Sequence, residues 1–341
     1  MSLRLGRLLV GASLLAALAA CGFDAGRGSL PAELSDQDFW NLSTSLSEPA
    51  GVFPYSDNLV SNELLFVHSL QRLRPRGGVY IGVGPEQNFS YIARLEPAMT
   101  FIVDIRKENR NLHLLYKALF ETSGDRVQFL SRLFSRDRPE GLSTSASVHD
   151  LFAAYHDATP SGALFDATTR LVRERLVDAR HLPLSQDDLT TIDYVLHAFY
   201  THGPDIDYGR SRPDSDPRPS YRELMTARDL SGESRNYLAS EDAFRFVKDL
   251  HARNLIVPVV GDFGAPQGAI ARVGQYVRQH GSSISAFYSS NVEVYLSKQQ
   301  MVAFCDNLLS LPATSRTWFI NSKQLLPLST RVDGCLPRAA K

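Results

Sequence analysis

Residues 79–104 of the chain read VYIGVGPEQNFSYIARLEPAMTFIVD and place one helical segment between two short apolar runs. Val79–Ile81 is rich in β-branched and aromatic residues and ends in a glycine pair, which predicts a strand followed by a tight turn. The apolar spacing of Gln87–Leu95 predicts a helix, and Thr100–Asp104 predicts a second buried strand. A compact βαβ unit of this kind joins parallel strands, so the stretch predicts a parallel sheet.

Alternating strand and helix signals continue along the rest of the chain. Residues 107 to about 252 repeat apolar residues at helical spacing, which predicts a large, mainly helical insertion. Strand signals return at Leu255–Val260, Ile284–Tyr288 and Thr317–Ile320, with helical segments between them. We therefore expect an α/β fold with a doubly wound, mostly parallel, Rossmann-like sheet, and the insertion between its second strand and its C-terminal strands.

The N-terminus has the parts of a secretory signal. Arg4 and Arg7 supply positive charge, and Leu8–Ala20 is apolar but shorter than the roughly 20 residues that cross a bilayer as a helix. Leu18-Ala19-Ala20-Cys21 resembles the lipobox of bacterial lipoproteins, which implies that residues 1–20 are removed and that lipid is attached to Cys21. The alternatives are a short N-terminal core helix and a misassigned start codon.

This interpretation predicts where the protein lies and what it contacts. The lipid binds a membrane of the cell envelope, and Gly22 in place of the Asp of the inner-membrane retention signal favours the periplasmic side of the outer membrane. Residues 21–52 are rich in Gly, Ser, Pro and Asp and predict a flexible tether, with one or two helical turns around Phe39 and Trp40. A single domain over 53–330 and a tail over 331–341 complete the expected organisation.

Composition excludes some classes of function. The chain is 43% hydrophobic and 21% charged with a net charge of -1, so nothing points to nucleic acid as a partner. No metal site is predicted, because the histidines are scattered and no HExxH or CxxC motif occurs. No GxSxG hydrolase elbow occurs either. Cys305 and Cys335 either form a disulfide in an oxidising compartment or are unrelated thiols.

The turn after the first predicted strand is the best local candidate for a binding site. Gly82 and Gly84 let the backbone turn tightly and approach a ligand, and the following helix start offers free N–H groups. Asp104 ends the next strand, where a carboxylate can accept hydrogen bonds from both hydroxyls of a ribose. The pattern predicts a nucleoside-containing ligand. The alternative is a turn that needs glycine for packing, with Asp104 capping the next helix.

These residues resemble class I S-adenosylmethionine-dependent methyltransferases. Val79–Gly84 is similar to their first motif, and Asp104 stands where the family has its ribose-binding acid, so the resemblance implies S-adenosylmethionine as the cofactor. The strands from Leu255 onward match more loosely. Tyr80 replaces an acid of the motif and Glu86 replaces its third glycine. A carboxylate at position 86 either crowds the cofactor or meets its sulfonium or amino group.

A second likeness is to a bacterial family without an assigned activity. It is carried by SDNLVSNE at 56–63, GVYIGVGPEQNF at 78–89 and PVVGDFGAP at 258–266. The likeness therefore adds no function to the first one.

Asp262 is the second candidate acid. It follows the strand predicted at 255–260, and parallel strands bring it to the same edge of the sheet as Gly84. Asp262 is expected either to act in catalysis, as a base or by positioning a nucleophile, or to cap the helix from Gln267.

Polar residues in two other places complete the candidate site. Tyr288, Asn291 and Glu293 follow the next predicted strand, and they either line the same cleft or make ordinary loop hydrogen bonds. Residues 56–58 and 61–63 surround the start of a helix predicted over 59–73, and they either cap that helix or form a lid over the cleft.

Export and cofactor chemistry pull the functional interpretation in two directions, because S-adenosylmethionine is a charged compound made in the cytosol. One interpretation is a lipid-anchored, methyltransferase-like protein, with no substrate assigned, whose nucleoside-cofactor cleft is formed by Gly82, Gly84, Glu86, Asp104 and Asp262. The other is an exported, non-catalytic binding or interaction lipoprotein that keeps the fold without that activity. The substitutions at Tyr80 and Glu86 support the second interpretation, and both stay open.

Overall fold

A mostly parallel, six-stranded sheet forms the centre of the computed structural model, which describes residues 29–54, 56–208 and 218–335. The strand order is β3-β2-β1-β4-β5-β6, in which β1 to β5 run parallel and β6 runs antiparallel. The strands are β1 (Val79–Gly82), β2 (Met99–Asp104), β3 (Ile256–Val260), β4 (Ile284–Ser290), β5 (Ala313–Asn321) and β6 (Leu325–Pro327). The expected α/β class and Rossmann-like sheet are confirmed.

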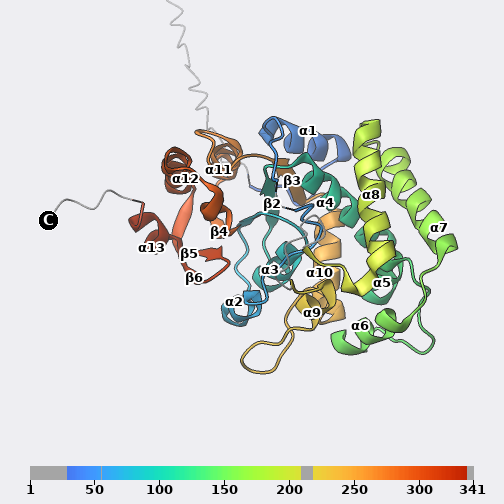
Figure 1. Cartoon of the computed structure of the whole chain (residues 1–341). Helices are drawn as coiled ribbons and strands as arrows, with labels where there is room; N and C mark the ends of the chain where they lie inside the picture. Colours follow the sequence, from blue (N-terminus) through green and yellow to red (C-terminus); the bar gives the residue numbers. More distant parts are fainter. Residues whose placement is uncertain (1–28, 55, 209–217, 336–341) are drawn as a thin grey trace, which may run out of the picture.

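The strand order reverses between β1 and β4. The chain steps from β1 to β2 to β3, and then returns through α11 (Ala269–Gln279) to place β4 on the other side of β1. This is the order of a Rossmann sheet, apart from the antiparallel β6, and a crevice forms outside the carboxyl ends of the strands at such a reversal. In Figure 1, α3 (Gln87–Leu95) and α4 (Lys107–Thr122) lie on one side of the sheet, and α11 and α12 (Lys298–Ser310) lie on the other. Every residue of β1, β2 and β3 is buried as a result.

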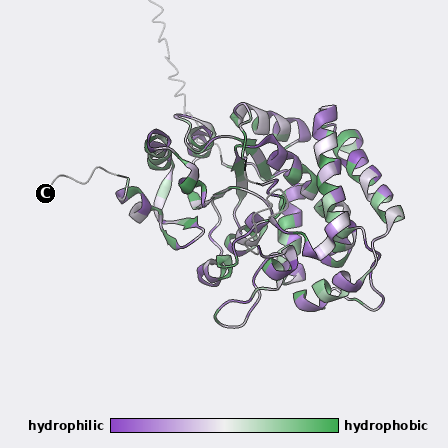
Figure 2. Ribbon diagram, viewed as in Figure 1, coloured by the Kyte–Doolittle hydropathy of each residue, from purple (hydrophilic) through white to green (hydrophobic). Residues whose placement is uncertain are grey.

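Helices fill the region between β2 and β3, as the sequence predicted. Figure 2 shows that the outer helices of this region alternate hydrophobic and hydrophilic residues, whereas the inner strands are mainly hydrophobic. Besides α4, the region contains α5 (Arg126–Phe134), α6 (Val148–Asp157), α7 (Gly162–Arg173), α8 (Gln186–His202), α9 (Tyr221–Thr226), α10 (Glu241–Ala252), the π-helix Glu174–Ala179 and the 3-10 helix Gly203–Asp205. The sequence did not predict α9, which is only six residues long.

Serine side chains set the start of many helices. In each case the serine hydroxyl accepts a hydrogen bond from a backbone N–H in the first turn, which satisfies one of the donors that a helix start leaves without an intrahelical partner. Helices α1, α6, α7, α8, α9, α10 and α12 begin in this way.

Part of the expected tether is instead a helix that packs on the sheet. Helix α1 (Asp36–Leu46) buries Phe39 completely and covers β3, the edge strand. The Ser43 hydroxyl donates to the carbonyl oxygen of Pro258, and the N–H of Glu48 donates to the carbonyl oxygen of Val260 at 2.8 Å. An edge strand exposes backbone groups that need partners, and the polar residues of this segment supply them. The polar composition therefore reflects capping and edge pairing, and a tether does not extend over residues 36–46.

The C-terminal end also differs from the expectation. Beyond β5, which was predicted as the last strand, β6 pairs with it and α13 (Leu328–Asp333) extends into the expected tail. A disulfide joins Cys305 of α12 to Cys335, whose Cα atoms lie 5.5 Å apart. The predicted signal sequence over 1–20 and the predicted lipid site at Cys21 lie outside the described residues. No helix in the described ranges is long and apolar enough to cross a membrane.

Candidate functional site

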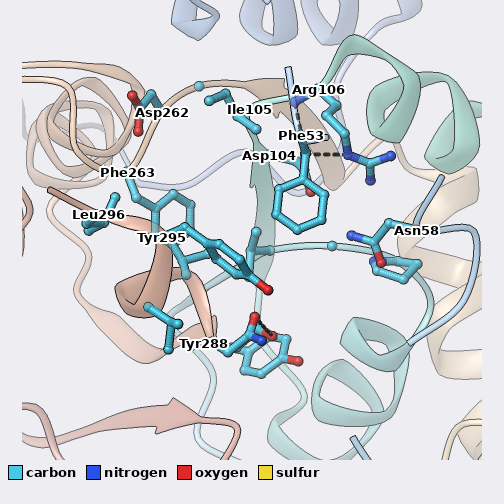
Figure 3. A pocket seen from close by; sticks show the side chains of 18 of the residues that line it. Phe53, Asn58, Asp104, Ile105, Arg106, Asp262, Phe263, Tyr288, Tyr295 and Leu296 are labelled. Carbon is cyan, nitrogen blue, oxygen red and sulfur yellow. Dashed lines mark hydrogen bonds and ion pairs between the residues drawn. The ribbon is translucent and has the colours of Figure 1, made fainter. Parts of the chain in front are cut away.

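A cavity of about 490 Å³ opens at the carboxyl ends of β1 to β4 (Figure 3). Its volume lies within the range of small-molecule sites in proteins. We call the part formed by residues 83–85, 104–106 and 261–262 the inner half, because these residues end or follow β1, β2 and β3. We call the part formed by Phe53, Phe263, Tyr288 and residues 290–292 and 294–296 the outer half.

The glycine turn of the inner half is held from behind by one asparagine. Gly84 lines the cavity with φ +77, a conformation that favours glycine. Gly82 does not line the cavity, and a Cβ there would lie 1.9 Å from Oδ1 of Asn88. The Asn88 amide donates to the carbonyl oxygens of Val83, Gly84 and Pro85, at 2.9, 3.1 and 2.7 Å. Gly82 therefore does not contact a ligand in the cavity. It is required for packing, which was the alternative interpretation of the turn.

Two further side chains behind the turn fix its position. The Tyr80 hydroxyl donates to Oδ1 of Asn88 at 2.9 Å. His113 of α4 is buried, and its Nε2 lies 2.8 Å from the carbonyl oxygen of Gly84. Burial lowers the pKa of His113 to about 4, so the imidazole is neutral at pH 7 and we assign its proton to Nε2, which donates to Gly84. The turn is thus held rigidly before any ligand arrives.

Glu86 does not reach the cavity, which corrects its expected role as a cofactor ligand. The residue is fully buried, and both carboxylate oxygens lie 3.1 Å from the backbone nitrogen of Ser61. Residues 52–54 and 56–63 cross over the glycine turn, and we call them the covering segment. From its position at the start of α3, Glu86 reaches this segment and accepts the N–H of Ser61. Burial raises the pKa of Glu86 to about 8, so the carboxyl is mostly protonated at pH 7.

Asp104 lines the inner half with one oxygen left for a ligand. Its Oδ1 accepts a hydrogen bond from the backbone N–H of Arg106 at 2.9 Å and lies 3.4 Å from Nε of the same residue. The described residues offer no partner to Oδ2. Asp104 is 4% exposed, and Figure 3 shows it behind the ring of Phe53. The capping alternative accounts for Oδ1 only, because this oxygen accepts the N–H of Arg106, the residue that precedes α4.

Arg106 is the only Lys or Arg among the described residues that line the cavity. Besides its contact with Asp104, its Nη1 donates to the carbonyl oxygen of Asp57 at 2.6 Å, which ties the covering segment to the end of β2. Its Nη2 is buried and has no partner among the described residues. The positive charge of this residue therefore largely balances the carboxylate of Asp104.

Asp262 lies at the edge of the cavity, with both oxygens engaged (Figure 3). Oδ1 accepts the N–H of Gly264 at 2.8 Å, and Oδ2 lies 3.3 Å from the side-chain nitrogen of Gln300. The helix-capping alternative does not hold, because Glu48 accepts the N–H of Ala269 at the start of α11. Glu48, which lies in the range predicted as a tether, also accepts the N–H of Asp262 at 3.0 Å and so holds this loop.

A partly buried polar network lies next to the outer half. The carboxylate of Glu63 accepts hydrogen bonds from the hydroxyls of Tyr288, at 2.9 Å, and Ser290, and from the amide of Gln87 at 3.3 Å. Burial raises the pKa of Glu63 above its usual range. Tyr288 and Ser290 line the cavity, and Ser290 has φ +52, an uncommon conformation for a residue with a side chain.

Aromatic rings form much of the wall of the outer half. Figure 3 shows Phe53, Phe263, Tyr288 and Tyr295 around the same space. Phe53 and Tyr295 meet edge to face, with ring centroids 5.1 Å apart, although they come from distant parts of the chain. Tyr295 belongs to the short helical turn Val292–Tyr295, in which Val294 is 75% exposed beside the opening.

The other expected site residues divide into two groups. Asn58, Ser61, Asn62, Tyr288 and Asn291 line the cavity, whereas Glu293 points to Arg331, with Oε1 and Nη2 2.6 Å apart. Helix α2 (Phe66–Arg72) begins after Leu65 and has no side-chain cap, so residues 56–58 and 61–63 do not cap it. Of these residues, Asn58, Ser61 and Asn62 border the cavity, and their role as a lid stays a prediction.

Phe53, Arg106 and Tyr295 were not predicted as site residues, and Glu63 was predicted only as part of a polar cluster. The position of Arg106, two residues after the end of β2, could have suggested its role, because a strand end in a parallel sheet commonly borders a ligand. No local signal connects Phe53 to Tyr295. Among the described residues, no group of three or more His, Cys, Asp or Glu could hold a metal ion.

The chain matches a protein family. Residues 58–181 and 212–325, more than half of the chain, match the family described as Domain of unknown function (DUF7790). The matched ranges include the segment from Asn58, the glycine turn, the ends of β1 to β4 and Tyr295, and exclude α1 and Phe53. No curated protein matches the chain.

Proposed function

The chain belongs to the DUF7790 family, and we propose that it binds a nucleoside in the inner half of its cavity, with S-adenosylmethionine as the ligand. The proposal makes the protein methyltransferase-like. It also includes the lipid anchor at Cys21 and a location in the cell envelope, which the N-terminal sequence alone supports.

The free oxygen of Asp104 is the observation that carries the proposal. A ribose presents two adjacent hydroxyl donors, and a carboxylate at the end of the second strand is placed to accept them. Ile105 follows with an apolar side chain that lines the cavity, and Gly84 lets the ligand approach the backbone. Strands β2 and β3 are neighbours, so a base attached to this ribose can extend towards the loop after β3.

The charges favour a nucleoside without phosphate groups. A phosphate-binding turn offers the N–H groups of a helix start and is commonly supported by basic side chains. Here the described lining holds one cationic side chain, Arg106, and two carboxylates, Asp104 and Asp262. Arg106 already contacts Asp104. A phosphorylated dinucleotide would meet little positive charge, whereas S-adenosylmethionine carries a positive sulfonium.

The residues of this chain have defined tasks in such a complex. Bound S-adenosylmethionine supplies an electrophilic methyl group. Asp104 binds the ribose, while Asn88 and His113 hold the turn that carries Gly84. The aromatic rings of the outer half exclude water from the space beside the ligand.

One observation favours the non-catalytic alternative. Both oxygens of Asp262, the expected base, are engaged within its own loop and with Gln300, so this carboxylate has little capacity left to accept a proton from a substrate. A binding protein needs the same nucleoside site without a base. The two functions predict the same ligand and differ only in turnover.

Titration calorimetry of the purified protein with adenosine and S-adenosylhomocysteine tests the proposal. We expect both compounds to bind, and we expect Asp104→Asn to weaken each about tenfold, because a hydrogen bond to a charged acceptor loses its charge assistance. Asp187→Asn, at an exposed position on α8, is the matched control and should leave binding unchanged. The absence of heat at millimolar ligand would contradict the proposal.

The proposed anchor has a separate test. Cys21→Ser should abolish metabolic labelling of the protein with a fatty acid and leave the precursor uncleaved, because the lipid is attached to the thiol. The double variant Cys305→Ser with Cys335→Ser, which removes the disulfide without leaving an unpaired thiol, is the control for loss of cysteine elsewhere in the chain, and labelling should persist in it. Labelling that persists in Cys21→Ser would exclude this cysteine as the anchor.

A further inference from the structure

The outer half of the cavity has aromatic walls, and a partly buried carboxylate lies next to one of its rings. Phe53, Phe263, Tyr288 and Tyr295 line it, and Tyr288 also donates its hydroxyl to Glu63 at 2.9 Å (Figure 3). Aromatic faces carry partial negative charge and attract cations, most effectively where water is excluded. Aromatic rings with a carboxylate beside them are therefore a chemical environment suited to a positive group.

Glu63 has donors but no cationic partner among the described residues. Tyr288, Ser290 and Gln87 donate to its carboxylate, and the described Lys, Arg and His residues form no ion pair with it. Burying an unpaired negative charge is costly, and the raised pKa of Glu63 expresses that cost. A cation placed next to this network offsets the cost, because it supplies the missing opposite charge.

We propose that the outer half binds an alkylated cation, either a sulfonium or a quaternary ammonium group, between its aromatic rings and the Glu63 network. An alkylated cation fits better than a primary ammonium, because its methyl groups need apolar contacts and offer no N–H or O–H donors. The hydroxyls of Tyr288 and Ser290 already donate to Glu63, so their hydrogen atoms do not oppose the cation. The inference rests on the proposed nucleoside function only for one of its two sources of the cation.

The two sources are the sulfonium of the nucleoside ligand itself and the quaternary ammonium of a second ligand. For the first source, calorimetry compares S-adenosylmethionine with S-adenosylhomocysteine, which lacks the charge. We expect S-adenosylmethionine to bind about tenfold more tightly, as desolvated cation–π contacts predict. Glu63→Gln and Tyr295→Leu should each reduce that preference, while adenosine affinity stays unchanged.

For the second source, choline is titrated into the protein with and without saturating S-adenosylhomocysteine. Its uncharged carbon isostere, 3,3-dimethylbutan-1-ol, should bind about tenfold more weakly, and Tyr295→Leu should reduce choline binding to a similar degree. Tyr200→Leu, on α8 and outside the cavity lining, is the matched control. Circular dichroism during thermal unfolding checks that each variant folds, and Phe53→Leu replaces Tyr295→Leu if that variant does not.

The outcomes separate this inference from the proposed function. A preference for S-adenosylmethionine assigns the cation to the cofactor, and choline binding assigns it to a second ligand. The inference is overturned if S-adenosylmethionine and S-adenosylhomocysteine bind equally and choline binds no better than its isostere. Choline binding without adenosine binding would support the cation site and contradict the nucleoside site.

Discussion

The two halves of the cavity are built in different ways. The inner half is formed by the ends of β1, β2 and β3, which are neighbours in the sheet. Contacts close in the sequence hold its polar atoms, as the Asn88 side chain holds the glycine turn. The outer half joins residues that are more than 200 positions apart, such as Tyr288 and Glu63, which are separated by 225 residues. Under the proposed function, the inner half is the site for the nucleoside, and the outer half selects the group that lies beside it.

The largest expected effect comes from breaking the inner half at Gly82. In Gly82→Val the new Cβ would overlap Asn88 Oδ1 and lie 2.7 Å from the Tyr80 hydroxyl, so the side chains that hold the turn must move. We expect the free energy of unfolding in urea to fall by about 3 kcal/mol, and adenosine binding to be lost.

Gly124→Ala is the control for this substitution. Its Cβ would meet only the Gln128 side chain, at 3.5 Å, and the position does not require positive φ. A Gly82→Val protein as stable as the wild type would show that the turn does not depend on Asn88.

Glu86→Gln tests whether Glu86 stabilises the fold or contacts the ligand. The folded protein keeps a proton on Glu86 up to a pKa of about 8, whereas the carboxyl in the unfolded chain releases it near its ordinary pKa of 4.5. The wild type should therefore lose stability as pH rises between these values, because the folded state binds the additional proton.

The amide that Glu86→Gln introduces does not titrate, so the stability of the variant relative to the wild type should rise by roughly 3 kcal/mol from pH 5 to pH 8. Urea unfolding at several pH values measures this difference. Adenosine affinity should not change, because Glu86 does not line the cavity. A loss of affinity would restore Glu86 as a ligand contact.

The smallest expected effect is that of Asp262→Asn. An asparagine oxygen can still accept the N–H of Gly264, and the Asp262 carboxylate has both oxygens engaged at the edge of the cavity. Calorimetry should show a change in adenosine affinity of less than about threefold. A loss of more than tenfold would mean that Asp262 contacts the ligand and that the inner half extends to the loop after β3.

The fold could be predicted well where its signals are local. Strands β1, β2 and β3 are continuous apolar runs bounded by turns, and helix α3 has the predicted bounds. Helix α1 was not predicted in full, because residues that cap and cover an edge strand have the same composition as a flexible linker. Strand β6 spans three residues, too few for a periodic pattern.

The candidate site could be predicted only in part, for a related reason. Strand-end positions place Gly84, Asp104 and Asp262 at one edge of the sheet from spacing alone. Spacing does not determine side-chain direction, so it could not show that Glu86 points to Ser61. Nor could it bring Phe53 to Tyr295, because that contact depends on how the covering segment crosses the sheet.

The contact between Asp104 and a ribose is the central claim, and one comparison tests it most directly. Calorimetry with adenosine and 2′,3′-dideoxyadenosine measures the contribution of the two hydroxyls in the wild type and in Asp104→Asn. We predict that the wild type binds adenosine more tightly by roughly 10- to 100-fold, and that the preference falls to within about threefold in the variant. Equal affinity of the wild type for the two compounds, or a preference that survives in Asp104→Asn, would contradict the assignment.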